Sequence, residues 1–199
     1  MFSNHPLRTA RDVDEVVETV LSLFRRHGHA EYHGEAVSQL EHAVQAAQLA
    51  RNLRPDDSEF ILAAFLHDIG HLCVADEKAV QMDGYGIGDH ETLGASYLIA
   101  RGFSSRIGRL VATHVEAKRY LVATDPAYFA GLSEASRQTL ARQGGPMSRE
   151  EVAAFELDPL MEDHLSLRRI DEQAKVTDQP VQDIFWLGML IRKHLLKRL

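Results

Sequence analysis

The sequence predicts an all-α fold, a compact single-domain helical bundle. Apolar residues recur at spacings of three and four along almost the whole chain, which is the periodicity of amphipathic helices. Alternating polar and apolar runs bounded by turn residues, which indicate strands, are hard to find. The 199 residues are 45% hydrophobic and 26% charged, as is typical of one globular domain with its own core. Because no internal repeat or dividing linker interrupts the chain, we expect a single domain over residues 1–199.

Three helices are expected in the N-terminal part of the chain. The first covers about residues 12–26 and stops where Gly28 follows His27, because glycine closes helix ends. The second covers about residues 35–53 and ends before Pro55, which disfavours helical backbone in the preceding residue. Acidic and hydroxyl side chains at residues 56–58 cap a third helix, which carries His67-Asp68 near its end.

Helices are expected to resume after a glycine-rich interruption at residues 84–88. One covers about residues 90–101, and Ser104-Ser105 then caps a helix that includes His114. Gly144-Gly145-Pro146 marks a loop, after which helices follow near Arg149, over about residues 159–175, and from about residue 181 to the end. We expect this last helix to pack in the core, although its apolar face and basic end also resemble a membrane-surface helix.

Charge and cysteine content narrow the functional classes. The 22 Lys and Arg against 29 Asp and Glu give a net charge of −7, so the surface repels nucleic-acid phosphates and no nucleic-acid partner is expected. One cysteine, Cys73, cannot form an internal disulfide, which fits a cytoplasmic location. Neither a signal peptide nor a stretch long enough to span a bilayer is apparent, and the oligomeric state is left open.

The most distinctive local feature is the adjacent pair His67-Asp68 in an apolar helix. An isolated pair of this kind is typical of a buried structural histidine. Here, further histidines and an aspartate fall on other expected helices, namely His42, His90, His114 and Asp171. Metal sites in helical bundles gather ligands from separate helices, and a carboxylate can bridge two ions. Nitrogen and oxygen ligands without thiolate suit iron, manganese or zinc.

This ordered set resembles the HD-domain superfamily, in the pattern of its mixed-valent diiron oxygenases of the PhnZ/TmpB type, which split 1-hydroxyphosphonates with dioxygen. The resemblance covers nearly the whole chain and includes six supporting segments: Tyr32-His33-Gly34-Glu35-Ala36, Gln39-Leu40-Glu41-His42, Leu66-His67-Asp68-Ile69-Gly70-His71, Gly84-Tyr85-Gly86, Ala117-Lys118-Arg119-Tyr120-Leu121 and Gln143-Gly144-Gly145-Pro146-Met147.

The resemblance implies two iron ions in an Fe(II)/Fe(III) state, with dioxygen as cosubstrate. Asp68 would bridge the two irons. The other implied ligands are His42, His67 and Asp171 for one iron, and His90 and His114 for the other.

The same resemblance implies a substrate site, whose phosphonate-holding residues are Lys118, Arg168, His71 and Ser136. Tyr32 and Glu35 match a pair in which the tyrosine occupies a metal position until substrate displaces it. Tyr32, Glu35, His71 and Lys118 are the catalytic residues implied.

The spacing of these residues agrees in part with such a site. His114 and Lys118 are four apart on one expected helix, so the cation projects one turn beyond a candidate ligand. Glu35 and His42 are expected on one face of the second helix.

The implied reaction converts a 1-hydroxyphosphonate carrying a 2-amino or 2-trimethylammonio group into glycine or glycine betaine and inorganic phosphate. Aromatic and acidic groups near the site, with room beside Gly88, favour the trimethylammonium group; the candidates are Tyr32, Glu35, Tyr85 and Asp89.

Two other interpretations remain open. An HD-domain metal-dependent phosphohydrolase shares the His-Asp pair and would use a metal-activated water against a phosphate ester. A helical binding module would use its histidines only structurally. The histidines outside the proposed site are expected at the surface, namely His27, His29, His33 and His164.

Overall fold

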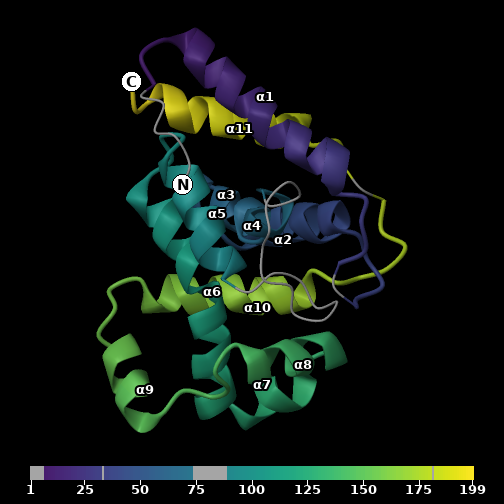
Figure 1. Cartoon of the computed structure of the whole chain (residues 1–199), viewed down its shortest axis with the longest axis vertical. Helices are drawn as coiled ribbons and strands as arrows, with labels where there is room; N and C mark the ends of the chain where they lie inside the picture. The colour runs from purple at the N-terminus through teal and green to yellow at the C-terminus, as the bar shows by residue number, and fades with distance from the viewer. Residues whose placement is uncertain (1–6, 33, 74–88, 181) are drawn as a thin grey trace.

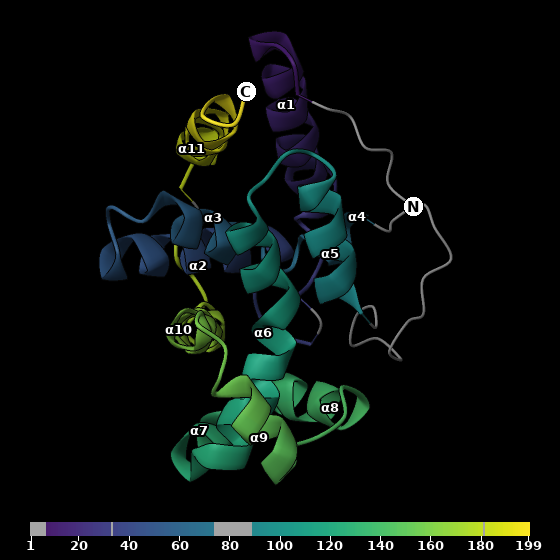
Figure 2. The same ribbon diagram turned by 90° about the vertical axis from the view of Figure 1, so that its left-hand side faces the viewer.

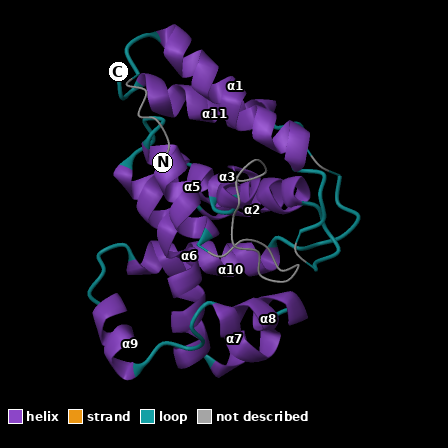
Figure 3. Ribbon diagram, in the orientation of Figure 1, coloured by secondary structure: helices purple, strands orange, loops and turns teal. Residues whose placement is uncertain are grey.

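The computed structural model describes residues 7–32, 34–73, 89–180 and 182–199. Every regular element in these ranges is a helix (Figure 3), and the one extended pairing is an isolated bridge between Glu31 and Ser38. The prediction of an all-α fold is therefore confirmed. The helices are α1 (Ala10–His27), α2 (Gln39–Leu53), α3 (Ser58–Leu66), α4 (Ile69–Cys73), α5 (His90–Ile99), α6 (Ser105–Thr124), α7 (Pro126–Gly131), α8 (Glu134–Arg142), α9 (Arg149–Phe155), α10 (Met161–Gln173) and α11 (Phe185–Leu196).

Side-chain caps determine where several of these helices begin. Asp57 and Ser104 accept hydrogen bonds from the first turns of α3 and α6, as expected. The start of the second helix was predicted wrongly. Ser38 caps α2, so the helix begins at Gln39 and Glu35 belongs to the preceding loop. The shared helix face expected for Glu35 and His42 therefore does not exist.

The helices form three regions along the long axis of the molecule (Figures 1 and 2). At one end α1 packs on α11, and at the other lie α7, α8 and α9. Between them, α2 to α6 and α10 surround the middle of the molecule. The unexpected helices α4, α7 and α8 are all short, with five to nine residues, too few to show a clear apolar period.

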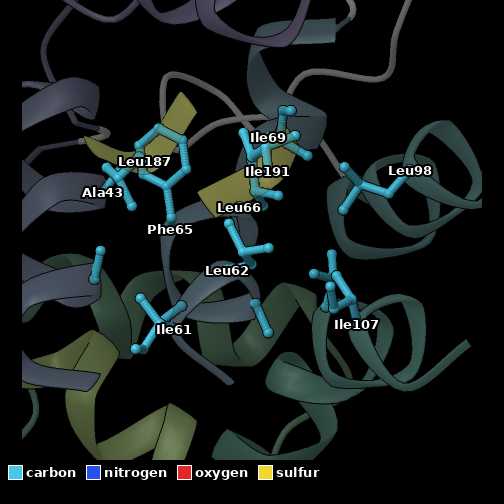
Figure 4. Packing of buried hydrophobic residues seen from close by; sticks show 14 of the residues in the cluster. Ala43, Ile61, Leu62, Phe65, Leu66, Ile69, Leu98, Ile107, Leu187 and Ile191 are labelled. Carbon is cyan, nitrogen blue, oxygen red and sulfur yellow. The ribbon is translucent and has the colours of Figure 1, made fainter. Parts of the chain in front are cut away.

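The main core surrounds α3, in which every residue from Phe60 to Leu66 is buried (Figure 4). A helix that is apolar on all sides is stable only inside the molecule. Its C-terminal continuation, His67-Asp68, is thereby carried into the interior, where His67 is fully buried.

Close backbone packing of α4 on α5 brings this pair beside His90. A Cβ atom on Gly70 would lie 1.9 Å from the carbonyl oxygen of His90, so only glycine fits at this contact. A smaller, separate apolar cluster joins α6 to α9 and α10. Its buried members are Ala117, Tyr120, Leu121, Phe155 and Leu165.

Two peripheral expectations have different outcomes. The last helix packs in the core through Leu187, Ile191 and Leu195, as expected, and no helix among the described residues combines the length and apolar character needed to cross a bilayer. The surface position expected for His164 is wrong: this side chain is fully buried near Phe155, because the face of α10 that carries it packs on α6. His33, Tyr85 and Gly88 lie outside the described residues.

Candidate metal centre

Three side chains from different helices form the first candidate metal group: His42 from α2, His67 at the end of α3, and Asp171 from α10. The Nε2 atoms of the two histidines are 3.0 Å apart. Oδ1 of Asp171 lies 3.4 Å from Nε2 of His42 and 3.7 Å from Nε2 of His67. One buried point is therefore surrounded by two nitrogens and one carboxylate oxygen.

A second group forms around Asp68, His90 and His114. Nε2 of His90 is 3.0 Å from Nε2 of His114, and the two atoms lie 3.2 and 3.4 Å from Oδ1 of Asp68. His71 also reaches this group, since its ring stacks on that of His90 with 3.9 Å between centroids. The second site thus has two candidate third ligands, His71 and His114.

Asp68 connects the two groups through its two carboxylate oxygens. Oδ1 faces His90 and His114, whereas Oδ2 lies 3.4 Å from Nε2 of His67 and 3.8 Å from Nε2 of His42. This is the arrangement that a carboxylate bridging two metal ions requires.

Hydrogen bonds on the far side of the rings show that these groups fit metal ions. The Nδ1 atoms of His42, His67 and His114 lie 2.8–2.9 Å from backbone carbonyl oxygens. A carbonyl oxygen only accepts, so each Nδ1 carries a hydrogen and each Nε2 faces the centre, where a metal ion would take its lone pair. The Nε2 atoms of His42 and His67, and those of His90 and His114, are therefore held 3.0 Å apart, as two ligands of one ion would be.

The carboxylate of Asp171 also indicates that the first group fits a metal ion. Oδ1 of Asp171 is buried and has no hydrogen-bond partner among the described residues. Burial raises the pKa of Asp171, but the Arg168 guanidinium and the His67 ring outweigh it and hold that pKa well below its usual range. An ionised, buried oxygen that no donor reaches is the kind of atom a metal ion satisfies.

Tyr32 covers this centre from the loop before α2. Its hydroxyl donates to Oδ2 of Asp68 at 2.7 Å, and its ring stacks on His42 with 3.9 Å between centroids. Burial and the negative charge of Asp68 hold the pKa of Tyr32 well above its usual value, so the phenol keeps its proton.

A pocket opens beside the two groups, and all the predicted substrate residues line it: Tyr32, Glu35, His71, Lys118, Ser136 and Arg168. Lys118 and Arg168 are only 3% and 5% exposed. Arg168 contacts Asp171 and Glu172 and donates through Nε to the hydroxyl of Tyr128 at 2.7 Å. Asp89, expected near the cationic end of the substrate, is exposed and is not among the residues lining the pocket.

Lys118 has a different environment from Arg168. Its Nζ donates to the hydroxyl of Thr139 at 3.0 Å, and no described carboxylate lies within ion-pair distance. Burial, together with the nearby charge of Arg168, lowers the pKa of Lys118 to about 7.

Sequence reasoning missed the polar pocket residues Thr139 and Lys175, and also Glu172, which contacts the pocket residue Arg168. Oε2 of Glu172 accepts a hydrogen bond from Nη2 of Arg168 at 2.6 Å. The two residues are four apart on one helix, so this contact could have been predicted from the sequence. Lys175 follows the end of α10, so helical periodicity gives no signal for it.

Comparison with known proteins agrees with this geometry. A family model described as HD domain matches residues 39–162, which include His67-Asp68. The chain belongs to the HD domain family. This HD domain protein is 41% identical over 179 residues to a [1-hydroxy-2-(trimethylamino)ethyl]phosphonate dioxygenase (glycine-betaine-forming) of Leisingera caerulea, with 89% of each chain covered. It is 38% identical to a hydroxymethylphosphonate dioxygenase of Gimesia maris, covering 89% of this chain and 87% of the relative. An uncharacterised protein of Acanthamoeba polyphaga mimivirus is 42% identical, with 90% and 81% covered.

Proposed function

We propose that this HD domain protein is a dioxygenase that cleaves the carbon–phosphorus bond of a 1-hydroxyphosphonate. Both named relatives are phosphonate dioxygenases, and each aligns with about nine tenths of this chain. We further propose that the centre holds two iron ions bridged by Asp68. His42, His67 and Asp171 would hold one ion, and His90 and His114 would hold the other.

The observation that carries this proposal is a buried cation that lies beside two histidine-aspartate groups and has no carboxylate partner among the residues that the structure describes. An unpaired buried charge is costly, and within the described part of the chain Lys118 meets only the hydroxyl of Thr139. A phosphonate entering the pocket would supply the missing negative charge. Its oxygens would then lie between Lys118 and the metal groups, where Arg168, Ser136 and His71 line the same space.

The residues of the chain thus bind and orient the substrate. Bound metal ions supply the redox and Lewis-acid chemistry that dioxygen requires. The protein would contribute a pocket lined by the buried cations Lys118 and Arg168, which would fix the phosphonate and present its hydroxyl-bearing carbon to the metals. Glu35, whose side chain is 14% exposed, would place a carboxylate oxygen near a cationic group at the other end of the substrate. We favour 1-hydroxy-2-(trimethylamino)ethylphosphonate over the primary amine.

The test is release of inorganic phosphate from this substrate by protein purified anaerobically, with its iron content measured. We expect about two irons per chain and phosphate release that requires dioxygen. Phosphate release from phosphate esters without dioxygen would instead establish the phosphohydrolase. Absence of metal and of turnover would leave the binding module.

The acidity of Lys118 predicts a pH dependence. Because its pKa in the free protein is about 7, the lysine loses its charge as the pH rises above 7, and kcat/KM should fall. kcat should fall less, since a bound phosphonate stabilises the charged lysine and raises its pKa. In Lys118→Arg, whose guanidinium stays charged, the alkaline fall of kcat/KM should disappear. An unchanged alkaline fall in this variant would assign it to another group.

Tyr32→Phe isolates the hydroxyl that contacts Asp68. The ring that stacks on His42 is retained, so we expect the variant to stay folded. Its resting metals lose the cover of the hydroxyl and should be more open to dioxygen, with activity lost several-fold faster during aerobic storage. Thermal unfolding, the iron spectrum and residual activity are the measurements, and storage loss equal to that of the parent protein would contradict the prediction.

A further inference from the structure

Lys175 joins three parts of the chain at the mouth of the pocket. Its Nζ lies 3.0 Å from Oε1 of Glu35 and 3.2 Å from Oε1 of Glu172, and it donates to the hydroxyls of Ser133 and Ser136 at 3.2 and 3.0 Å. The side chain is only 11% exposed. An ammonium group has three donors, so this lysine is fully engaged by the loop before α2, by α8 and by α10.

The two carboxylates that meet Lys175 differ in their other partners. Glu172 also accepts hydrogen bonds from the Arg168 guanidinium, from the backbone N–H of Ser133 and from the hydroxyl of Ser136. Glu35 receives the hydroxyl of Ser133 at 2.5 Å, and Lys175 is the only cation within ion-pair distance of it among the described residues. Loss of Lys175 would therefore leave Glu172 paired and Glu35 without a counter-ion.

Both partners of Glu35 approach the same oxygen. Ser133 and Lys175 contact Oε1, and Oε2 has no hydrogen bond within the described part of the chain. Because Glu35 lines the pocket, the carboxylate is held on one oxygen and leaves the other for a bound molecule.

We propose that Lys175 determines which substrates the pocket accepts, as the internal counter-ion of Glu35. This inference rests on the proposed phosphonate dioxygenase function. With Lys175 in place, Glu35 is neutralised whether or not the substrate carries a positive charge. Phosphonates with an uncharged end then enter without leaving a buried, unpaired carboxylate, which would be costly.

Removal of Lys175 makes the charge of Glu35 depend on the substrate. A trimethylammonium group can replace the lost cation, whereas an uncharged substrate cannot. Lys175→Met keeps much of the aliphatic volume and removes the charge, so it should disfavour hydroxymethylphosphonate relative to 1-hydroxy-2-(trimethylamino)ethylphosphonate. We expect the ratio of their kcat/KM values to shift about tenfold towards the cationic substrate, the size of one charge-assisted contact.

Two matched variants separate this role from a general loss of pocket charge. Lys118→Met removes a pocket cation that does not contact Glu35, so it should weaken both substrates and leave their ratio within about twofold. Adding Glu35→Gln to Lys175→Met removes the unpaired carboxylate, and the ratio should return most of the way to that of the parent protein.

The same ratios should be measured by anaerobic binding titrations of the iron-loaded protein, with thermal unfolding of each variant. A shifted ratio in Lys175→Met that Glu35→Gln reverses supports the proposal. An unchanged ratio with a lowered unfolding temperature would show that Lys175 only stabilises the contact between the loop and α10, and this result would overturn the proposal. If the parent protein released no phosphate from either compound, the dioxygenase function would fail, while the binding ratios would still decide the role of Lys175.

Discussion

Replacing Asp68 with alanine should remove most of the iron from the protein and lower phosphate release by more than 100-fold. One oxygen of this carboxylate faces each histidine group, at 3.2 Å from Nε2 of His90 and 3.4 Å from Nε2 of His67. Loss of a bridging ligand affects both ions, whereas changes outside the ligand shell cost roughly 10- to 100-fold. Alanine suits the helical surroundings, so the secondary structure should survive.

Iron per chain and circular dichroism are the measurements for this variant. Asp14→Ala is the matched control, because this exposed aspartate pairs with Arg192 far from the site and its loss should leave the iron content unchanged. Two irons retained per chain in Asp68→Ala would refute the bridging role.

Lys118→Met should raise KM for the phosphonate and lower kcat/KM by about 100-fold, with a smaller change in kcat. A charge-assisted hydrogen bond to an anion is worth roughly 1.5–3 kcal/mol, and interactions made equally in ground and transition states appear in KM. Equal losses in kcat and kcat/KM would instead place Lys118 in stabilisation of the transition state.

The same substitution should stabilise the substrate-free protein. The pKa of Lys118 falls from 10.5 in an exposed lysine to about 7 on folding, so the folded state binds this proton less tightly than the unfolded chain. The resulting cost to folding is absent well above pH 10.5 and grows as the pH falls towards 7. The gain in unfolding temperature from Lys118→Met should therefore be larger at pH 7 than at pH 10. Lys193→Met, at an exposed lysine on α11, should show neither effect.

The sequence by itself determined the helical class and the residues that meet at the centre. Apolar periodicity depends on local backbone geometry, so it located most of the long helices, and caps such as Asp57 and Ser104 marked their starts. The ordered histidines and aspartates were predicted to converge, and His42, His67, Asp68 and Asp171 do so because α3 is buried on every side and carries the His-Asp pair inwards.

Only the tertiary structure decided the surroundings of that centre. Glu35 lines the pocket from a loop and not from a helix, His164 is buried, and Lys175 connects Glu35 to α10 across 140 positions of sequence. None of these contacts follows a local period. They depend on the distances between separate helices and loops, which burial and packing fix when the whole chain folds.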